Sequence, residues 1–236
     1  MTSSTLLLRL AAPLQSWGMD AKFEIRRTNR EPTKSGVIGL LAAALGRRRD
    51  ESVDDLSRLH FGVRVDQEGE LLRDYHTASS PKKESERYVT ERYYLSDAVF
   101  LVGLESADRD LLYSIEEALR FPVFPLFLGR RSCPPTLPLL LGIRETSLLE
   151  ALKQEPWLAS PWIQKKKYHG SVKLRIMTDA NPEDNRAARQ MDLPISYHPR
   201  HRQYTYRACK EHDSLSIKAA TDFSTTMHDP MIELPD

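Results

Sequence analysis

The segment SGVIGLLAAALG, residues 35–46, limits the fold more than any other part of the sequence. It is apolar nearly all round, which predicts a helix that is buried on most of its sides rather than a surface helix. Thr33 or Ser35 is suited to cap its start, and Gly46 is suited to end it. Its apolar run is about half of the roughly 20 residues that a membrane-spanning helix needs, so we expect a helix in a large protein core.

Composition supports an ordinary soluble protein. Of the 236 residues, 40% are hydrophobic and 28% are charged, which is close to average globular usage. The two cysteines, Cys133 and Cys209, are too few for a disulfide framework and are interpreted as reduced thiols. We therefore expect a cytoplasmic protein without a secretory signal and without a membrane partner.

The order of apolar segments predicts an α+β fold. Around the buried helix we expect a second helix at 108–119, capped by Asp108, and a β-hairpin with arms at 71–77 and 87–95. Strands are expected at 5–10, 60–65, 98–104 and, in two short pieces, within 121–141. Without the hairpin this order is βαββαβ, the ferredoxin-like arrangement.

The last third of the chain gives a weaker pattern. Strands are expected near 172–177 and 203–208, with a polar insertion at 179–190. We divide the chain into a domain at 1–145, a smaller, mostly β region at 146–212, and a polar tail at 213–236 that we expect to be disordered.

Charge is segregated along the chain although the net charge is only +1. Residues 1–50 carry nine lysines and arginines against four acids, and further basic runs lie at 165–175 and 200–210. Such segregation suits a polyanion bound on one face. Any single run is also typical of a solvated surface.

Two early motifs have nucleic-acid chemistry. PTKSG at 32–36 opens the buried helix, whose N-terminal N–H groups attract anions, and Lys34 adds a charge beside them. PLQSWG at 13–18 offers Trp17 for stacking on a base and Gln15 for hydrogen bonding. The alternatives are an ordinary helix cap and a tryptophan that fills the core.

Two later motifs add candidates. In LRDYHT, residues 72–77, His76 and Tyr75 with Lys34 could serve a metal-independent ribonuclease, or they could bind RNA without cutting it. In LGRRSCP, residues 128–134, Arg130 and Arg131 suit phosphate, but adjacent residues of an extended segment point to opposite faces.

Four side chains in the last third of the chain are candidate metal ligands. His198 and His201 with Cys209 and His212 have a spacing that imitates a zinc site, but they fall on a loop leading into a strand, which disperses them. We predict neither a metal nor any other cofactor.

Four segments in series carry a resemblance to a known family. LLLRLAAPLQSWG, PTKSGVIGLLAAALG, LRDYHT and FLGRRSCPPTLPLLLG occur in this order, and a basic, aromatic stretch, LPISYHPRHRQYTYR, follows them. Together they resemble the CasD family, the RAMP-type subunit of the type I-E CRISPR Cascade complex. The resemblance is dense over residues 5–143 and extends over most of the chain.

The resemblance implies a ferredoxin-like core with a long hairpin, the thumb, at about 78–93. It implies a non-catalytic subunit that grips the 5′ handle of the crRNA, contacts the backbone subunit CasC and the large subunit CasA, and meets target DNA only through the assembled complex. The RNA contacts that it nominates are Gln15, Trp17, Thr33, Lys34, Ser35, Tyr75, His76, Thr77, Arg130 and Arg131. The thumb cations expected to touch a partner are Lys82, Lys83, Arg87 and Arg92. A metal-independent endoribonuclease that processes the crRNA precursor, using His76, Tyr75 and Lys34, is the alternative.

Overall fold

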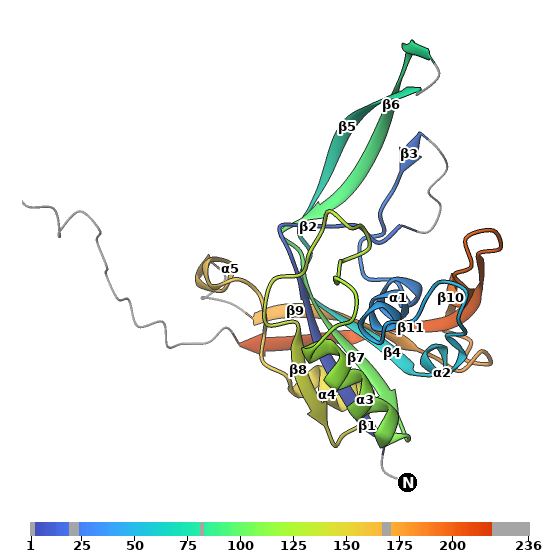
Figure 1. Cartoon of the computed structure of the whole chain (residues 1–236). Helices are drawn as coiled ribbons and strands as arrows, with labels where there is room; N and C mark the ends of the chain where they lie inside the picture. Colours follow the sequence, from blue (N-terminus) through green and yellow to red (C-terminus); the bar gives the residue numbers. More distant parts are fainter. Residues whose placement is uncertain (1–2, 19–23, 81–82, 167–170, 219–236) are drawn as a thin grey trace, which may run out of the picture.

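A computed structural model describes residues 3–18, 24–80, 83–166 and 171–218 (Figure 1). The elements follow in the order β1 (Ser4–Ala11), β2 (Leu14–Gln15), β3 (Ile25–Arg26), α1 (Lys34–Ala44), α2 (Asp54–Ser57), β4 (His60–Gln67), β5 (Glu70–Ser80), β6 (Lys83–Ser96), β7 (Val99–Ser106), α3 (Arg109–Arg120), β8 (Leu140–Arg144), α4 (Leu148–Gln154), α5 (Pro161–Lys166), β9 (Ser171–Asp179), β10 (Ala188–Ser196) and β11 (Gln203–Lys218). No helix in these four stretches is long and apolar enough to cross a membrane.

Within the described residues, seven strands form one large sheet in the order β10-β11-β9-β4-β7-β1-β8. Every neighbouring pair in it is antiparallel. The C-terminal strands extend the sheet of the N-terminal part, because β9 pairs directly with β4. The sheet therefore runs without a break across residue 145.

Helices cover both faces of this sheet. Leu6, Leu8 and Leu10 of β1 point to one face and pack in a cluster with α1 and α3, whereas Leu7 points to the other face and packs against α4. The helix expected at 35–46 is confirmed as α1, with Val37, Ile38 and other apolar side chains fully buried. The second helix is confirmed as α3, and the carboxylate of Asp108 accepts a hydrogen bond from the N–H of Leu111.

The predicted hairpin is present and longer than expected. β5 and β6 pair in register from Glu70 opposite Ser96 to the far end of the ribbon, which stands away from the large sheet (Figure 1). The short strands β2 and β3 pair with the opposite edge of β6. Among the expected thumb cations, Arg87 is exposed, Arg92 is half-buried near the hairpin base, Lys82 lies outside the described residues, and only the backbone of Lys83 is described.

Several expectations for the second half of the chain are wrong in detail. Only one strand, β8, lies within 121–141 and just beyond, because the preceding proline-rich segment forms a loop. Strand β10 begins inside the expected polar insertion, and α4 and α5 were not predicted. β11 continues to Lys218, so residues 213–218 belong to the sheet rather than to a tail, and 219–236 lie outside the described residues.

Candidate nucleic-acid interface

A groove with a cavity volume of about 490 Å³ runs along α1. Its floor is the small-residue face of that helix. One wall comes from the loop 124–131 and the other from the connection of β10 to β11 and the start of β11, and residues 16–18 and 47–49 lie at the two ends. The lining includes Ser16, Trp17, Gly18, Ser35, Gly36, Arg47, Arg48, Arg49, Phe124, Phe127, Gly129, Arg131, Tyr197, Arg202 and Tyr204.

Five arginines line this groove, and no acidic residue of the described chain does. Arg47 is neutralised locally, since its guanidinium forms an ion pair with Asp55 and thereby lowers the pKa of that carboxyl. Arg48, Arg49, Arg131 and Arg202 are exposed. Cations placed beside the rings of Phe124, Phe127 and Tyr204 are the combination that holds a single-stranded nucleic acid, through phosphate charge and base stacking.

The floor and one wall of the groove are fixed to each other. A Cβ atom on Gly36 would lie 2.8 Å from Cε3 of Trp17, so glycine is required for the indole to pack against the helix. On the other side, the hydroxyl of Tyr197 donates a hydrogen bond to the carbonyl oxygen of Ser35. Burial raises the pKa of the Tyr197 hydroxyl, which keeps the proton available for this bond.

Gln15 and Trp17, which were selected as RNA contacts, are buried and bonded to other groups of the chain. Gln15 is fully buried, and its amide donates to the carbonyl oxygen of Ala98 at 2.7 Å. The indole N–H of Trp17 donates to Oε1 of Gln15 at 3.1 Å, and the ring is 1% exposed. A side chain without exposed surface offers no face for base stacking, so these two residues build the end of the groove from behind.

The helix start at PTKSG is already capped by protein groups. The hydroxyl of Thr33 accepts from the N–H of Gly36 at 3.2 Å, and a carboxylate oxygen of Asp192 accepts from the N–H of Lys34 at 2.8 Å. The ammonium of Lys34 is 2.8 Å from the carboxylate of Asp179 and is almost completely buried. Two carboxylates of the chain itself therefore hold the groups of Lys34 that were expected to bind a phosphate.

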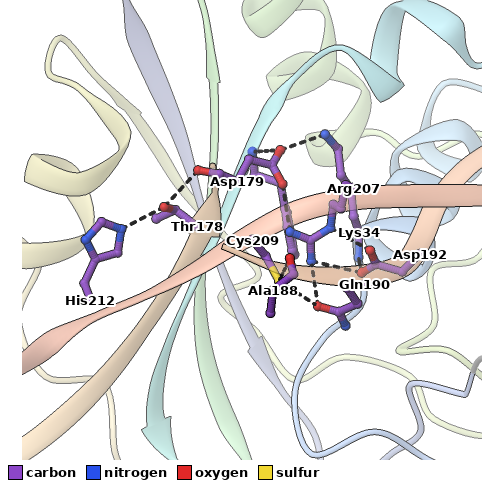
Figure 2. A network of polar contacts seen from close by, with 10 residues as sticks. Lys34, Thr178, Asp179, Ala188, Gln190, Asp192, Arg207, Cys209 and His212 are labelled. Atoms are coloured by element: carbon purple, nitrogen blue, oxygen red, sulfur yellow. Dashed lines mark hydrogen bonds and ion pairs between the residues drawn. The ribbon is translucent and has the colours of Figure 1, made fainter. Parts of the chain in front are cut away.

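These carboxylates belong to a buried network that joins α1 to the C-terminal strands (Figure 2). Arg207 donates from Nη1 to Asp179 at 2.7 Å and from Nε to Asp192 at 2.6 Å. Asp192 is fully buried, and Asp179 also accepts from the N–H of Phe61. Two cations and two anions therefore balance each other inside the fold, a pairing that buried charges require.

The LRDYHT candidates lie on the hairpin rather than in the groove. Tyr75 is 57% exposed, and the guanidinium of Arg73 lies 4.7 Å from the centre of its ring. His76 is half-exposed and contacts the carboxylate of Asp74 at 2.5 Å through Nε2, and Thr77 is exposed. Tyr75 and His76 are neighbours on one strand and point to opposite faces, so the structure does not gather them with buried Lys34 into one set.

The two arginines of LGRRSCP diverge, as predicted for adjacent residues. Arg131 lines the groove. Arg130 packs outside it, with its guanidinium 4.5 Å from the ring centre of Tyr94 and Nη2 donating to the carbonyl oxygen of Arg26 at 2.8 Å.

The zinc alternative finds no assembled site in the described parts of the chain, where no group of three or more metal-ligating side chains occurs. Cys209 is buried, and its thiol contacts the carbonyl oxygen of Ala188. His212 contacts the hydroxyl of Thr178 at 2.8 Å.

Sequence reasoning missed most of the groove. Arg48, Arg49, Arg202, Phe124 and Tyr204 were not selected as candidate site residues. A signal for them was present, because 47–49 is a run of three arginines directly after the buried helix, and the stretch at 193–207 is both basic and aromatic.

The chain is similar to several known proteins. The family model described as CRISPR-associated protein (Cas_Cas5) matches residues 5–210. The CRISPR system Cascade subunit CasD of Escherichia coli (strain K12) is 40% identical over 166 residues, which are 61% of this chain and 73% of that protein. A solved structure described as "CRISPR RNA-guided surveillance complex" aligns with a TM-score of 0.75 and 28% identity, over 94% of this chain and 95% of that one. Another, "Crystal structure of Cas protein", aligns with a TM-score of 0.66 and 40% identity, over 90% and 95%. The chain therefore belongs to the CRISPR-associated Cas5 family.

Proposed function

We propose that this chain is a structural, non-catalytic subunit of a type I-E Cascade complex and that it holds the 5′ handle of the crRNA in the groove along α1. The observation that carries the proposal is the lining of that groove. It combines exposed arginines with aromatic rings, and no described aspartate or glutamate is part of it. The similarity to CasD, whose name describes a Cascade subunit, supports the assignment of the complex.

The same proposal assigns roles to the rest of the fold. The strand order β8-β1-β7-β4, with α1 and α3 on one face, supports a ferredoxin-like unit. The β5–β6 hairpin acts as the thumb against the backbone subunit CasC, and the large subunit CasA docks nearby. Target DNA is met only through the assembled complex.

Removal of groove cations should weaken RNA binding in a salt-dependent manner. We expect Arg131→Ala and Arg202→Ala each to lower affinity for a handle-containing RNA by roughly tenfold, because each loses a charge-assisted contact with phosphate. The slope of log affinity against log salt should fall by about 0.7 for each lost phosphate contact. Fluorescence anisotropy over a range of salt concentrations measures both effects.

Arg58→Ala is the matched control, since Arg58 is exposed and lies outside the groove lining. It should leave affinity and slope close to those of the wild-type chain. Groove variants that behave like Arg58→Ala would contradict the placement of the RNA.

His76→Ala separates the proposed RNA-binding subunit from the ribonuclease alternative. Incubated with a repeat-containing RNA and EDTA, the wild-type chain should retain the RNA intact, and His76→Ala should change affinity by at most a few-fold. The reason is that His76, Tyr75 and Lys34 are not assembled into one site. Native and denaturing gels run on the same samples give the readout, and a discrete cut that disappears in His76→Ala would establish the nuclease.

A further inference from the structure

Two arginine side chains near the base of the hairpin have donors that the fold leaves unused. Nε of Arg92 and Nη1 of Arg130 are buried, and neither has a hydrogen-bond partner among the described residues. A buried donor without an acceptor costs free energy that folding does not recover. Both arginines are only half-buried as whole residues, so an acceptor from outside the chain can approach their guanidinium groups.

The backbone brings these two arginines to the same face of β6. Arg92 and Tyr94 are two residues apart on that strand and therefore point to the same side. Arg130 lies on that side, with its guanidinium over the ring of Tyr94. The bond from Arg130 to the carbonyl oxygen of Arg26 strengthens the placement, because Arg26 pairs with Arg92 in the β3–β6 register.

The nearby carboxylates are engaged elsewhere. Glu91 points to the other face of β6, where Nε of Arg73 donates to it at 3.1 Å. Asp74 lies opposite Arg92 in the β5–β6 register and on the same face, but its Oδ2 is taken up by a contact with Nε2 of His76 at 2.5 Å. Neither carboxylate forms an ion pair with Arg92 or Arg130, so the positive charge on this side of the strand remains available for a ligand.

The site also adjoins one end of the groove along α1. Ser16 lines that end, and its hydroxyl donates to the carbonyl oxygen of Tyr93 at 3.2 Å, between Arg92 and Tyr94. Arg131 lines the groove, and Arg130 precedes it in the chain. The two unused donors therefore lie beside the Ser16 end of the groove.

We propose that Arg92 and Arg130 form a clamp for one backbone phosphate of the bound RNA, at the base of the hairpin. The inference rests on the proposed function. It specifies that the bound group is a phosphate and that Arg92 binds it together with Arg130. A phosphodiester carries one negative charge, and its oxygens match the planar fork of a guanidinium. The edge of a base offers acceptors but no negative charge. Tyr94 is a positioning residue, because its ring holds the guanidinium of Arg130.

The test combines changes in the protein with changes in the RNA. Full-length chain is titrated with handle-containing RNAs in which one linkage at a time is replaced by an uncharged methylphosphonate. With the wild-type chain, replacement of the one RNA linkage that occupies the clamp should weaken binding by about tenfold. In Arg92→Gln and Arg130→Gln that linkage should lose its effect, because the phosphate no longer has its partner.

Arg58→Gln is the control, since Arg58 is an exposed arginine that lies outside both the hairpin and the groove lining. It should show the wild-type sensitivity at every linkage. Circular dichroism of each variant confirms that it is folded, and Arg130→Lys, which keeps the charge but not the fork, should restore only part of the effect.

The outcomes separate the clamp from the proposed function. If the wild-type chain binds the RNA and the same linkages remain sensitive in Arg92→Gln and Arg130→Gln, the clamp is overturned and the RNA-binding function stands. If the wild-type chain has no affinity for the RNA that exceeds its affinity for a scrambled sequence of equal length, both are overturned.

Discussion

Gly129→Ala should unfold the wall of the groove and lower the stability of the chain by more than about 4 kcal/mol, which is exceptional for a single substitution. Gly129 has a φ of +82°, and a Cβ atom there would lie 1.6 Å from the carbonyl oxygen of Ser16. That oxygen belongs to the backbone of a buried residue whose N–H donates to Leu128 at 3.1 Å, so it cannot move aside without breaking the contact. Thermal unfolding followed by circular dichroism measures the loss.

Gly142→Ala separates this clash from simple backbone strain. Gly142 also has a positive φ, +93°, but the atom nearest to an added Cβ is Nη1 of Arg144 at 3.6 Å, an ordinary van der Waals distance. We expect a cost of roughly 1 to 2 kcal/mol, from the left-handed conformation alone. Equal losses in the two variants would mean that the approach of Gly129 to Ser16 does not hold the loop in place.

Local patterns explain which parts of the fold were predictable. The helix at 35–46, the Asp108 cap and the two hairpin arms each depend on residues close together in the sequence, and all three are confirmed. β10 was hidden because its pairing with β11 shifts register between Gln190 and Leu193 and again between Pro194 and Ser196. Such irregularities break the two-residue alternation by which a strand is identified.

The candidate site was harder to predict because its chemistry depends on distant partners. PTKSG has the residues of an anion site, but Asp192, 158 residues beyond Lys34, supplies the anion from within the chain. Nothing near Lys34 in the sequence indicates this. Arg131, selected from the sequence together with Arg130, lines the groove, whereas Arg48 and Arg202 reach the same groove from segments that only the tertiary fold brings together.

Asp192→Ala should destabilise the chain by about 3 to 5 kcal/mol, because it leaves the charge of Arg207 buried without its main partner. It also removes the acceptor for the N–H of Lys34 at the start of α1. For a chain of this size the melting temperature should fall by roughly 6 to 20 °C. Asp184→Ala, which removes a carboxylate from the more exposed pair with Lys210, should produce a much smaller shift.

A double variant tests whether charge balance is the cause. Asp192→Leu combined with Arg207→Met removes one anion and one cation, and the pair of Lys34 with Asp179 remains. Since exchange of a buried ion pair for apolar side chains is often close to neutral, this variant should be more stable than Asp192→Ala. A double variant less stable than Asp192→Ala would show that the hydrogen bonds of the network, rather than its charge balance, hold α1 to the C-terminal strands. RNA binding should follow the same order, because Tyr197, Arg202 and Tyr204 follow Asp192 in the chain and form one wall of the groove.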